Sequence, residues 1–310
     1  MSKPYSHIYI SPHLDDAVCS CGGLIKSQTA RGERVLVLTL FTAGIEDENE
    51  LPPYLRALHL VWGFGTTEGL NDPFAARRQE DLAALDMLGA AHQHIGWRGA
   101  LYRQASDGRF LYSGLSYFGP PVKEDQRLLA RIRRLMLSLR QQYPEAILYA
   151  PLGVGGHVDH RLTHQAARYV PGPMRFYEDV PYVFMGKVAP VIMNLMALSA
   201  RIGWRGSQYS GGGRINGWIS AVQSRTSLFG GPQLSLWSNR RLGSGHWQPL
   251  AYPIDLPAKF DAMVQYASQI PMLFGSPQWA WQSLETYATS IEKNAHLPHE
   301  RQWALQTRDF

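Results

Sequence analysis

Apolar and polar positions alternate along the first part of the chain in blocks that predict strands and helices in turn. Residues 7–12 and 34–41 are short apolar runs, typical of strands that are buried on both faces of a sheet. Between them, residues 22–31 predict a helix that begins at a glycine pair. The order strand, helix, strand is that of a β-α-β unit with parallel strands.

The alternation continues further along the chain. An Asp-Pro pair at 72–73 is typical of a helix start and precedes a leucine stripe that ends at Gly89, and residues 94–97 predict a short strand. Residues 124–143 carry apolar side chains on one face and arginines off it, and residues 146–150 predict another strand. We therefore expect an α/β fold with a Rossmann-like, mostly parallel sheet and helices on both faces.

Composition sets limits on this picture. With 310 residues and 45% hydrophobic composition, the chain can form one large domain, or one domain with an extension. The net charge of +5 comes from arginines spread over several segments, which disfavours a nucleic-acid arm and weakly favours an anionic substrate or surface. Cys19 and Cys21 are too close for an unstrained disulfide, so buried thiols are expected. The N-terminus lacks a secretion pattern, which predicts a cytoplasmic location.

Two polar clusters follow two of the predicted strands. The first cluster, SPHLDDAV, contains His13, Asp15 and Asp16, and the second, GGHVDH, contains His157, Asp159 and His160. The carboxyl ends of parallel strands lie at one edge of a sheet, so we expect the clusters to converge. Two or more imidazoles with a carboxylate suit zinc, and three protein ligands leave a position for water. Either cluster alone is weak evidence, because histidines and aspartates are common in caps and loops; both together are stronger.

With RRQEDLAALDMLG between them, these motifs resemble the PIG-L/LmbE-like superfamily of metal-dependent N-deacetylases over about residues 5–182. The superfamily includes the N-acetylglucosaminyl-phosphatidylinositol deacetylase and the deacetylases of mycothiol and bacillithiol biosynthesis. Its first motif is His-Pro-Asp-Asp, and here Leu14 replaces the proline, which changes the loop but removes no ligand. The resemblance implies an LmbE-like catalytic core at 1–184. A C-terminal extension at 185–310 is expected to pack on the core and contribute to the substrate pocket.

The resemblance also implies a role for each polar residue of the clusters. The implied metal ligands are His13, Asp16 and His160, and the implied catalytic residues are Asp15 as general base, His157 at the reacting centre and Asp159 as a partner that orients its neighbouring histidine. Which aspartate of the pair binds the metal rests on the resemblance alone. The implied cofactor is Zn²⁺, with Fe²⁺ or another divalent ion as alternatives.

The chemistry of amide hydrolysis explains why such a set is needed. The reaction requires an activated water, a stabilised oxyanion and a proton for the leaving amine. A bound zinc ion lowers the pKa of its water to about 7 and polarises the carbonyl. The remaining carboxylate can take the proton of the water, and a protonated His157, its pKa raised by a partner carboxylate, can stabilise the oxyanion or protonate the nitrogen.

The implied function is removal of an acetyl group from an N-acetylated sugar or sugar conjugate of the N-acetylglucosamine type. A metal-dependent amidase that acts on a larger acyl or thiol conjugate is the alternative enzyme, and a non-catalytic metal-binding relative is the third hypothesis. The expected partner is a small glycoconjugate and not a nucleic acid. The sequence leaves the oligomeric state open, a homo-oligomer included.

Residues outside the clusters are candidates for substrate binding. Arg77 either pairs with Glu80 one helical turn away or shapes the pocket for a hydroxyl-rich or anionic substrate. Asp179 is the candidate acceptor for a sugar hydroxyl, with a turn carboxylate before a proline as the alternative. Residues 183–201 are the most apolar stretch but fall short of a transmembrane span, so a core or lid helix is favoured over an interfacial helix. The glycine-rich residues 202–214 predict a loop.

Overall fold

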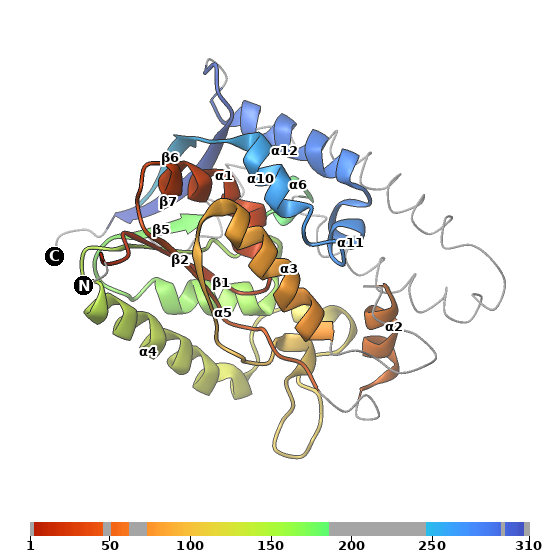
Figure 1. Ribbon diagram of the computed structural model, residues 1–310. Helices are drawn as coiled ribbons and strands as arrows, with labels where there is room; N and C mark the ends of the chain where they lie inside the picture. The colour runs from red at the N-terminus through yellow and green to blue at the C-terminus, as the bar shows by residue number, and fades with distance from the viewer. Residues whose placement is uncertain (1–2, 46–50, 62–72, 186–245, 293–294, 307–310) are drawn as a thin grey trace.

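A seven-stranded sheet lies at the centre of the described part of the molecule (Figure 1). Its strands follow the order β3-β2-β1-β4-β5-β7-β6. The structure is a computed structural model that describes residues 3–45, 51–61, 73–185, 246–292 and 295–306. Parallel pairing joins β1 (His7–Ser11), β2 (Val35–Thr39), β3 (Ala91–His94), β4 (Ile147–Pro151) and β5 (Met174–Tyr177). The antiparallel strands β7 (His299–Gln306) and β6 (His246–Pro253) extend the sheet beyond β5.

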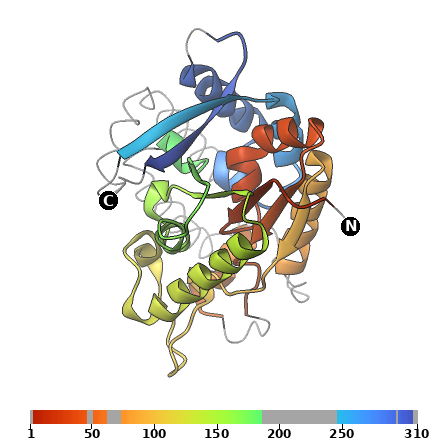
Figure 2. The ribbon, with the colours of Figure 1, turned by 90° about the vertical axis from the view of Figure 1, so that its left-hand side faces the viewer.

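Helices cover both faces of this sheet (Figures 1 and 2). One face carries α1 (Asp16–Ala30), α3 (Pro73–Leu88) and α10 (Leu256–Met263), which contact one another, and the other carries α4 (Gln126–Gln142) and α5 (Val158–Ala167). The other α-helices of the described residues are α2 (Pro53–Val61), α6 (Tyr182–Met185), α11 (Ile270–Phe274) and α12 (Pro277–Ile291). The expected Rossmann-like α/β fold is confirmed.

Strand β1 lies between β2 and β4 and pairs with both of them in parallel, so that His7 is in register with Val35 on one side and with Ile147 on the other. The chain leaves β1 through α1 toward β2, and it returns to the far side of β1 only at β4. The order of the strands therefore reverses between β1 and β4. Ligands of open α/β sheets bind at the carboxyl ends of the strands at such a point.

Helix α1 differs from the predicted helix, because it begins at Asp16 and contains the glycine pair that was expected to open it. Both glycines are buried where the C-terminal part of the chain packs on α1. A Cβ atom on Gly23 would lie 2.7 Å from Cβ of Ile254, and one on Gly22 would lie 3.2 Å from Cγ of Lys259. The glycines thus permit close packing and do not mark a helix start. The short strand expected at 94–97 is also shifted, since β3 ends at His94.

The described residues beyond 245 share the sheet and the core with the N-terminal part. Strand β7 pairs with β5, and the Tyr266 hydroxyl donates to Asp81 of α3 at 2.6 Å. Both cysteines are buried and free, as expected. Residues 186–201 of the long apolar segment and the whole glycine-rich segment 202–214 lie outside the described residues. Within the described part, no helix has the length and apolar character needed to cross a membrane.

Candidate active site

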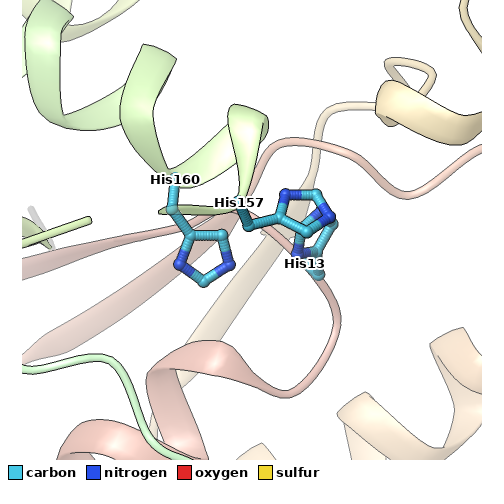
Figure 3. Close-up of side chains that lie close together, drawn as sticks. All are labelled: His13, His157 and His160. Carbon is cyan, nitrogen blue, oxygen red and sulfur yellow. The ribbon is translucent and has the colours of Figure 1, made fainter. Parts of the chain in front are cut away.

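The two polar clusters meet at the carboxyl ends of β1 and β4. His13 lies on the loop after β1, His157 is the residue before α5, and His160 lies in the first turn of α5. The rings approach one another closely (Figure 3), with centroid distances of 4.8 Å between His13 and His157 and 5.2 Å between His13 and His160. Asp16 completes this group as the first residue of α1.

Buried carboxylates fix the orientation of two of these histidines. Nε2 of His13 lies 3.0 Å from Oδ2 of Asp159, and Nδ1 of His160 lies 2.5 Å from Oδ1 of Asp179. A carboxylate accepts hydrogen bonds, so each histidine donates the proton on that nitrogen, and in the neutral ring the other nitrogen carries a lone pair. Carboxylate partners of this kind are typical of metal-binding histidines.

The two remaining nitrogens both face Asp16. Its Oδ2 lies 3.1 Å from Nδ1 of His13 and 3.2 Å from Nε2 of His160, and the latter atom is buried without a hydrogen-bond partner. Ligand atoms at about 2.0–2.2 Å from a tetrahedral zinc ion are roughly 3.3 Å apart, so the spacing of Asp16 from each histidine nitrogen suits a shared divalent ion. His13, His157 and His160 form a second candidate set, in which nitrogens of the three rings lie within 4.8 Å of one another.

The carboxylate of Asp16 also controls the protonation of His13 and His160. Burial opposes protonation of both histidines, yet the negative charge of Asp16 raises the pKa of His13 and raises the pKa of His160 well above its usual range. In the absence of a cation, protonated His13 and His160 therefore balance the negative charge of Asp16. A divalent ion bound here would displace these protons, which makes binding dependent on pH.

The adjacent aspartates have opposite electrostatic environments. Burial and the charge of Asp16 raise the pKa of Asp15 to about 7, although Arg77, 3.6 Å away, acts in the other direction. For Asp16, burial is outweighed by His160 and His13, which hold its pKa well below the usual range. Paired carboxylates whose pKa values are pushed apart are typical of sites where one acts as a base and the other stays ionised. Asp15 also has a φ of 152°, a strained conformation for a residue other than glycine.

His157 differs from the expected protonated histidine. Its Nδ1 accepts a hydrogen bond from the backbone N–H of Asp159 at 3.2 Å, which places the proton of the neutral ring on Nε2. Burial and the positive charge of His13 lower the pKa of His157 well below its usual value. The Asp159 carboxylate raises the pKa of His157 by less than these two effects lower it. Its Oδ2 lies 4.0 Å from Nδ1 of His157 and is hydrogen-bonded to His13. Asp159 therefore orients His13 and not a neighbouring histidine.

The other candidate residues have definite places. Arg77 lines the pocket beside Asp15, whereas Glu80 accepts hydrogen bonds from the backbone and side chain of Ser268 at 2.8 and 2.6 Å. Asp179 is buried, and its two oxygens face His160 and the backbone N–H of Val154. This position does not fit the expected contact with a sugar hydroxyl, because Asp179 is 1% exposed and does not line the pocket.

The walls of the pocket were not found from the sequence. They are mainly aromatic and apolar and include Phe41, Phe74, Tyr102, Tyr117, Phe118, Tyr182, Met272 and Leu273. These residues come from loops and helices far apart in the chain, so no local motif joins them. Arg103, which contacts Asp159 from behind the pocket, was missed for the same reason.

A Rossmann-like sheet with a histidine and aspartate cluster at its switch point defines a candidate metal-dependent hydrolase. The profile of the PIG-L family, described as GlcNAc-PI de-N-acetylase, matches residues 8–170. This match covers more than half of the chain, and the chain therefore belongs to the PIG-L family, as its motifs indicate.

Two relatives are 2'-N-acetylparomamine deacetylases. The chain is 32% identical to that of Streptomyces fradiae over 180 residues, which are 56% of this chain and 57% of the relative. It is 27% identical to that of Niallia circulans over 188 residues, which are 56% of this chain and 66% of the relative. The chain thus aligns with less than two thirds of either protein.

Solved structures of similar fold align with this chain. The zinc-inhibited form of teicoplanin deacetylase Orf2 has a TM-score of 0.70 at 23% identity, covering 97% of this chain and 98% of that one. The A40926 pseudoaglycone deacetylase Dbv21 has a TM-score of 0.65 at 24% identity, covering 98% of both chains. The C-terminal strands and helices therefore belong to the shared architecture.

Proposed function

We propose that this protein is a metal-dependent N-deacetylase that removes the acetyl group from an N-acetylated amino sugar of a glycoconjugate. The observation that carries the proposal is the pair of adjacent aspartates. Asp16 faces two histidine nitrogens as an anion, while Asp15 beside it titrates near neutral pH. Membership of the PIG-L family and the names of the relatives support the same chemistry.

His13, Asp16 and His160 would hold the ion. We favour Zn²⁺ because two imidazole nitrogens and one carboxylate oxygen are a typical set for catalytic zinc, and Fe²⁺ accepts similar ligands. When bound, the ion supplies a Lewis acid that polarises the acetyl carbonyl and acidifies water. Asp159 and Asp179 serve as the partners that keep the two ring nitrogens directed at this point.

Asp15 is the proposed general base. It lies in the pocket, and burial raises its pKa to about 7 in the metal-free chain. An ion held by the neighbouring Asp16 would lower this pKa, so that Asp15 is ionised and can accept the proton of water near neutral pH. The carboxylic acid formed in this step can return the proton to the leaving amine. Arg77, at 3.6 Å, limits the rise in the pKa of Asp15 and helps to hold its carboxylate in the pocket.

His157 is the proposed donor to the oxyanion. Its Nδ1 is engaged by the backbone, so the neutral ring offers Nε2–H as a donor in the pocket. A neutral imidazole with a lowered pKa can polarise a carbonyl oxygen without giving up its proton. Removal of a single oxyanion donor typically slows catalysis by a factor on the order of 10² to 10³.

The pocket lining supports a sugar as the attached group. The polar residues His13, Asp15 and Asp16 line the pocket together with aromatic side chains that include Tyr117 and Phe118. A sugar ring offers hydroxyls at its edge and apolar C–H groups on its faces, which suit such a mixed surface. We include aminoglycoside and glycopeptide conjugates in the proposed substrate class, since the relatives are named for compounds of these kinds.

The proposal is tested by assay of acid release from purified protein supplied with Zn²⁺. N-acetylglucosaminides and 2'-N-acetylparomamine are compared with the same amines carrying a longer acyl group. We expect release of acetate, loss of activity with a chelator and recovery with metal. Release of only the longer acid would favour the alternative amidase. A protein that binds one ion per chain and releases neither acid would overturn the assignment as a hydrolase.

A further inference from the structure

Arg103 is a buried arginine that lies outside both sequence motifs and joins two carboxylates. Its side chain is 9% exposed. Nη1 donates to Oδ1 of Asp159, while Nε and Nη2 lie 2.9 and 3.1 Å from the two oxygens of Asp125. The planar guanidinium thus connects the start of α5 with the start of α4, because Asp125 directly precedes α4.

The contacts of Asp159 are divided between its two oxygens. Oδ1 is held by Arg103, whereas Oδ2 accepts from the backbone N–H of Ala100 at 2.8 Å and from Nε2 of His13 at 3.0 Å. The side chain is completely buried. With both oxygens engaged, the carboxylate has one orientation, and that orientation directs Oδ2 at His13.

Asp125 is itself held firmly. The Tyr112 hydroxyl donates to Oδ2 of Asp125 and accepts from the backbone N–H of Val122 at 2.8 Å. Arg103 therefore has a fixed partner on the side away from the pocket. The chain of contacts from Tyr112 to His13 is continuous and lies almost entirely in the interior.

We infer that Arg103 is a positioning residue for the metal site: through Asp159 it fixes the tautomer and ring orientation of His13, so that Nδ1 stays directed at Asp16. The inference rests on the proposed function, because it concerns how tightly the site holds its ion. Loss of a partner that orients a metal-binding histidine typically weakens metal affinity by about 10- to 100-fold.

The test measures Zn²⁺ affinity by competition with a chromophoric chelator, which requires no substrate. We expect Arg103→Met to bind Zn²⁺ about 10- to 100-fold more weakly than the wild type. Arg103→Lys should be intermediate, because an ammonium keeps the charge but cannot form the fork that holds both carboxylates.

Arg140 provides a matched control. Its side chain is also buried, and it donates to the backbone carbonyls of Pro144, Ala146, Pro171 and Pro173. These residues precede β4 and β5, at the edge of the sheet opposite the site. Arg140→Met should therefore lower the unfolding temperature and leave Zn²⁺ affinity unchanged.

Each outcome decides between the alternatives. Wild-type Zn²⁺ affinity in Arg103→Met would overturn the inference. An equal loss of Zn²⁺ affinity in Arg140→Met would also overturn it, since affinity would then follow the overall stability of the fold. If Arg103→Met does not fold, Arg103→Lys decides: weaker binding supports the inference and wild-type affinity overturns it. A wild-type chain that binds no Zn²⁺ would overturn the proposed function itself.

Discussion

Replacement of Asp15 by asparagine is expected to have opposite effects on activity and on stability. Asparagine keeps the shape of the side chain but cannot accept the proton of water, so hydrolysis should fall by a factor on the order of 10² to 10⁴. The effect on stability follows from burial and the charge of Asp16, which raise the pKa of Asp15 from 3.8 to about 7. This difference means that ionisation of Asp15 costs the folded chain roughly 4 kcal/mol.

The sign of the pH dependence is fixed by this rise. Because the folded pKa exceeds the unfolded one, the contribution of Asp15 to stability is fully present below about pH 4 and is lost as the pH rises through about 7. The asparagine side chain of the variant does not ionise. The free energy of unfolding of Asp15→Asn should therefore exceed that of the wild type by up to about 4 kcal/mol above pH 8, and by much less near pH 5.

Denaturant unfolding of the metal-free protein, with a chelator present, measures this difference at about pH 5 and pH 8.5. Asp16→Asn is the matched control, because the histidines hold the pKa of Asp16 below its usual range and its ionised form stabilises the fold. That variant should be less stable than the wild type at neutral pH. If the gain in Asp15→Asn is the same at both pH values, Asp15 does not titrate with a raised pKa and its role as a tuned base fails.

Four further substitutions test the site and its support. His13→Ala and His160→Ala should each lose the single divalent ion that we expect metal analysis to find in the wild type; full occupancy in both would remove them as ligands. His157→Ala should keep the ion and lower kcat by a factor on the order of 10² to 10³, with the shape of the pH profile unchanged, because the pKa of His157 is already below the assay range. A kcat near that of the wild type would remove His157 as the oxyanion donor. Gly23→Ala should lower the free energy of unfolding by about 1–3 kcal/mol in chemical denaturation, through contact with Ile254, and wild-type stability would show that this packing relaxes freely.

The regular elements of the core could be predicted from the sequence because their apolar patterns are local. Strands β1 and β4, and the amphipathic helix α4, lie within one or two residues of their predicted positions. The start of α1 was wrong, since a glycine pair usually marks a turn and here it meets α10 and the residues before it. That contact joins segments more than 200 residues apart, and no short window of sequence contains it.

The site shows the same division. That the two motifs converge can be predicted, because the carboxyl ends of parallel strands lie at one edge of a sheet. Which side chains pair with each other there cannot be predicted from the strand order. Asp179 was expected at a sugar hydroxyl and lies against His160, and Asp159 pairs with His13 across the site. Arg103 has no motif of its own and becomes visible only when Asp125 and Asp159 are seen on either side of it.

The pairing of His13 with Asp159 has a consequence for assembly of the chain. These residues are 146 positions apart, and they meet only when β4 has joined β1. Closing so long a loop lowers the conformational entropy of the chain before other contacts form that compensate for this cost. An ion held at this point would act as a removable cross-link between the two halves of the sheet, so its release should follow the separation of the central strand pair and report on that step of unfolding.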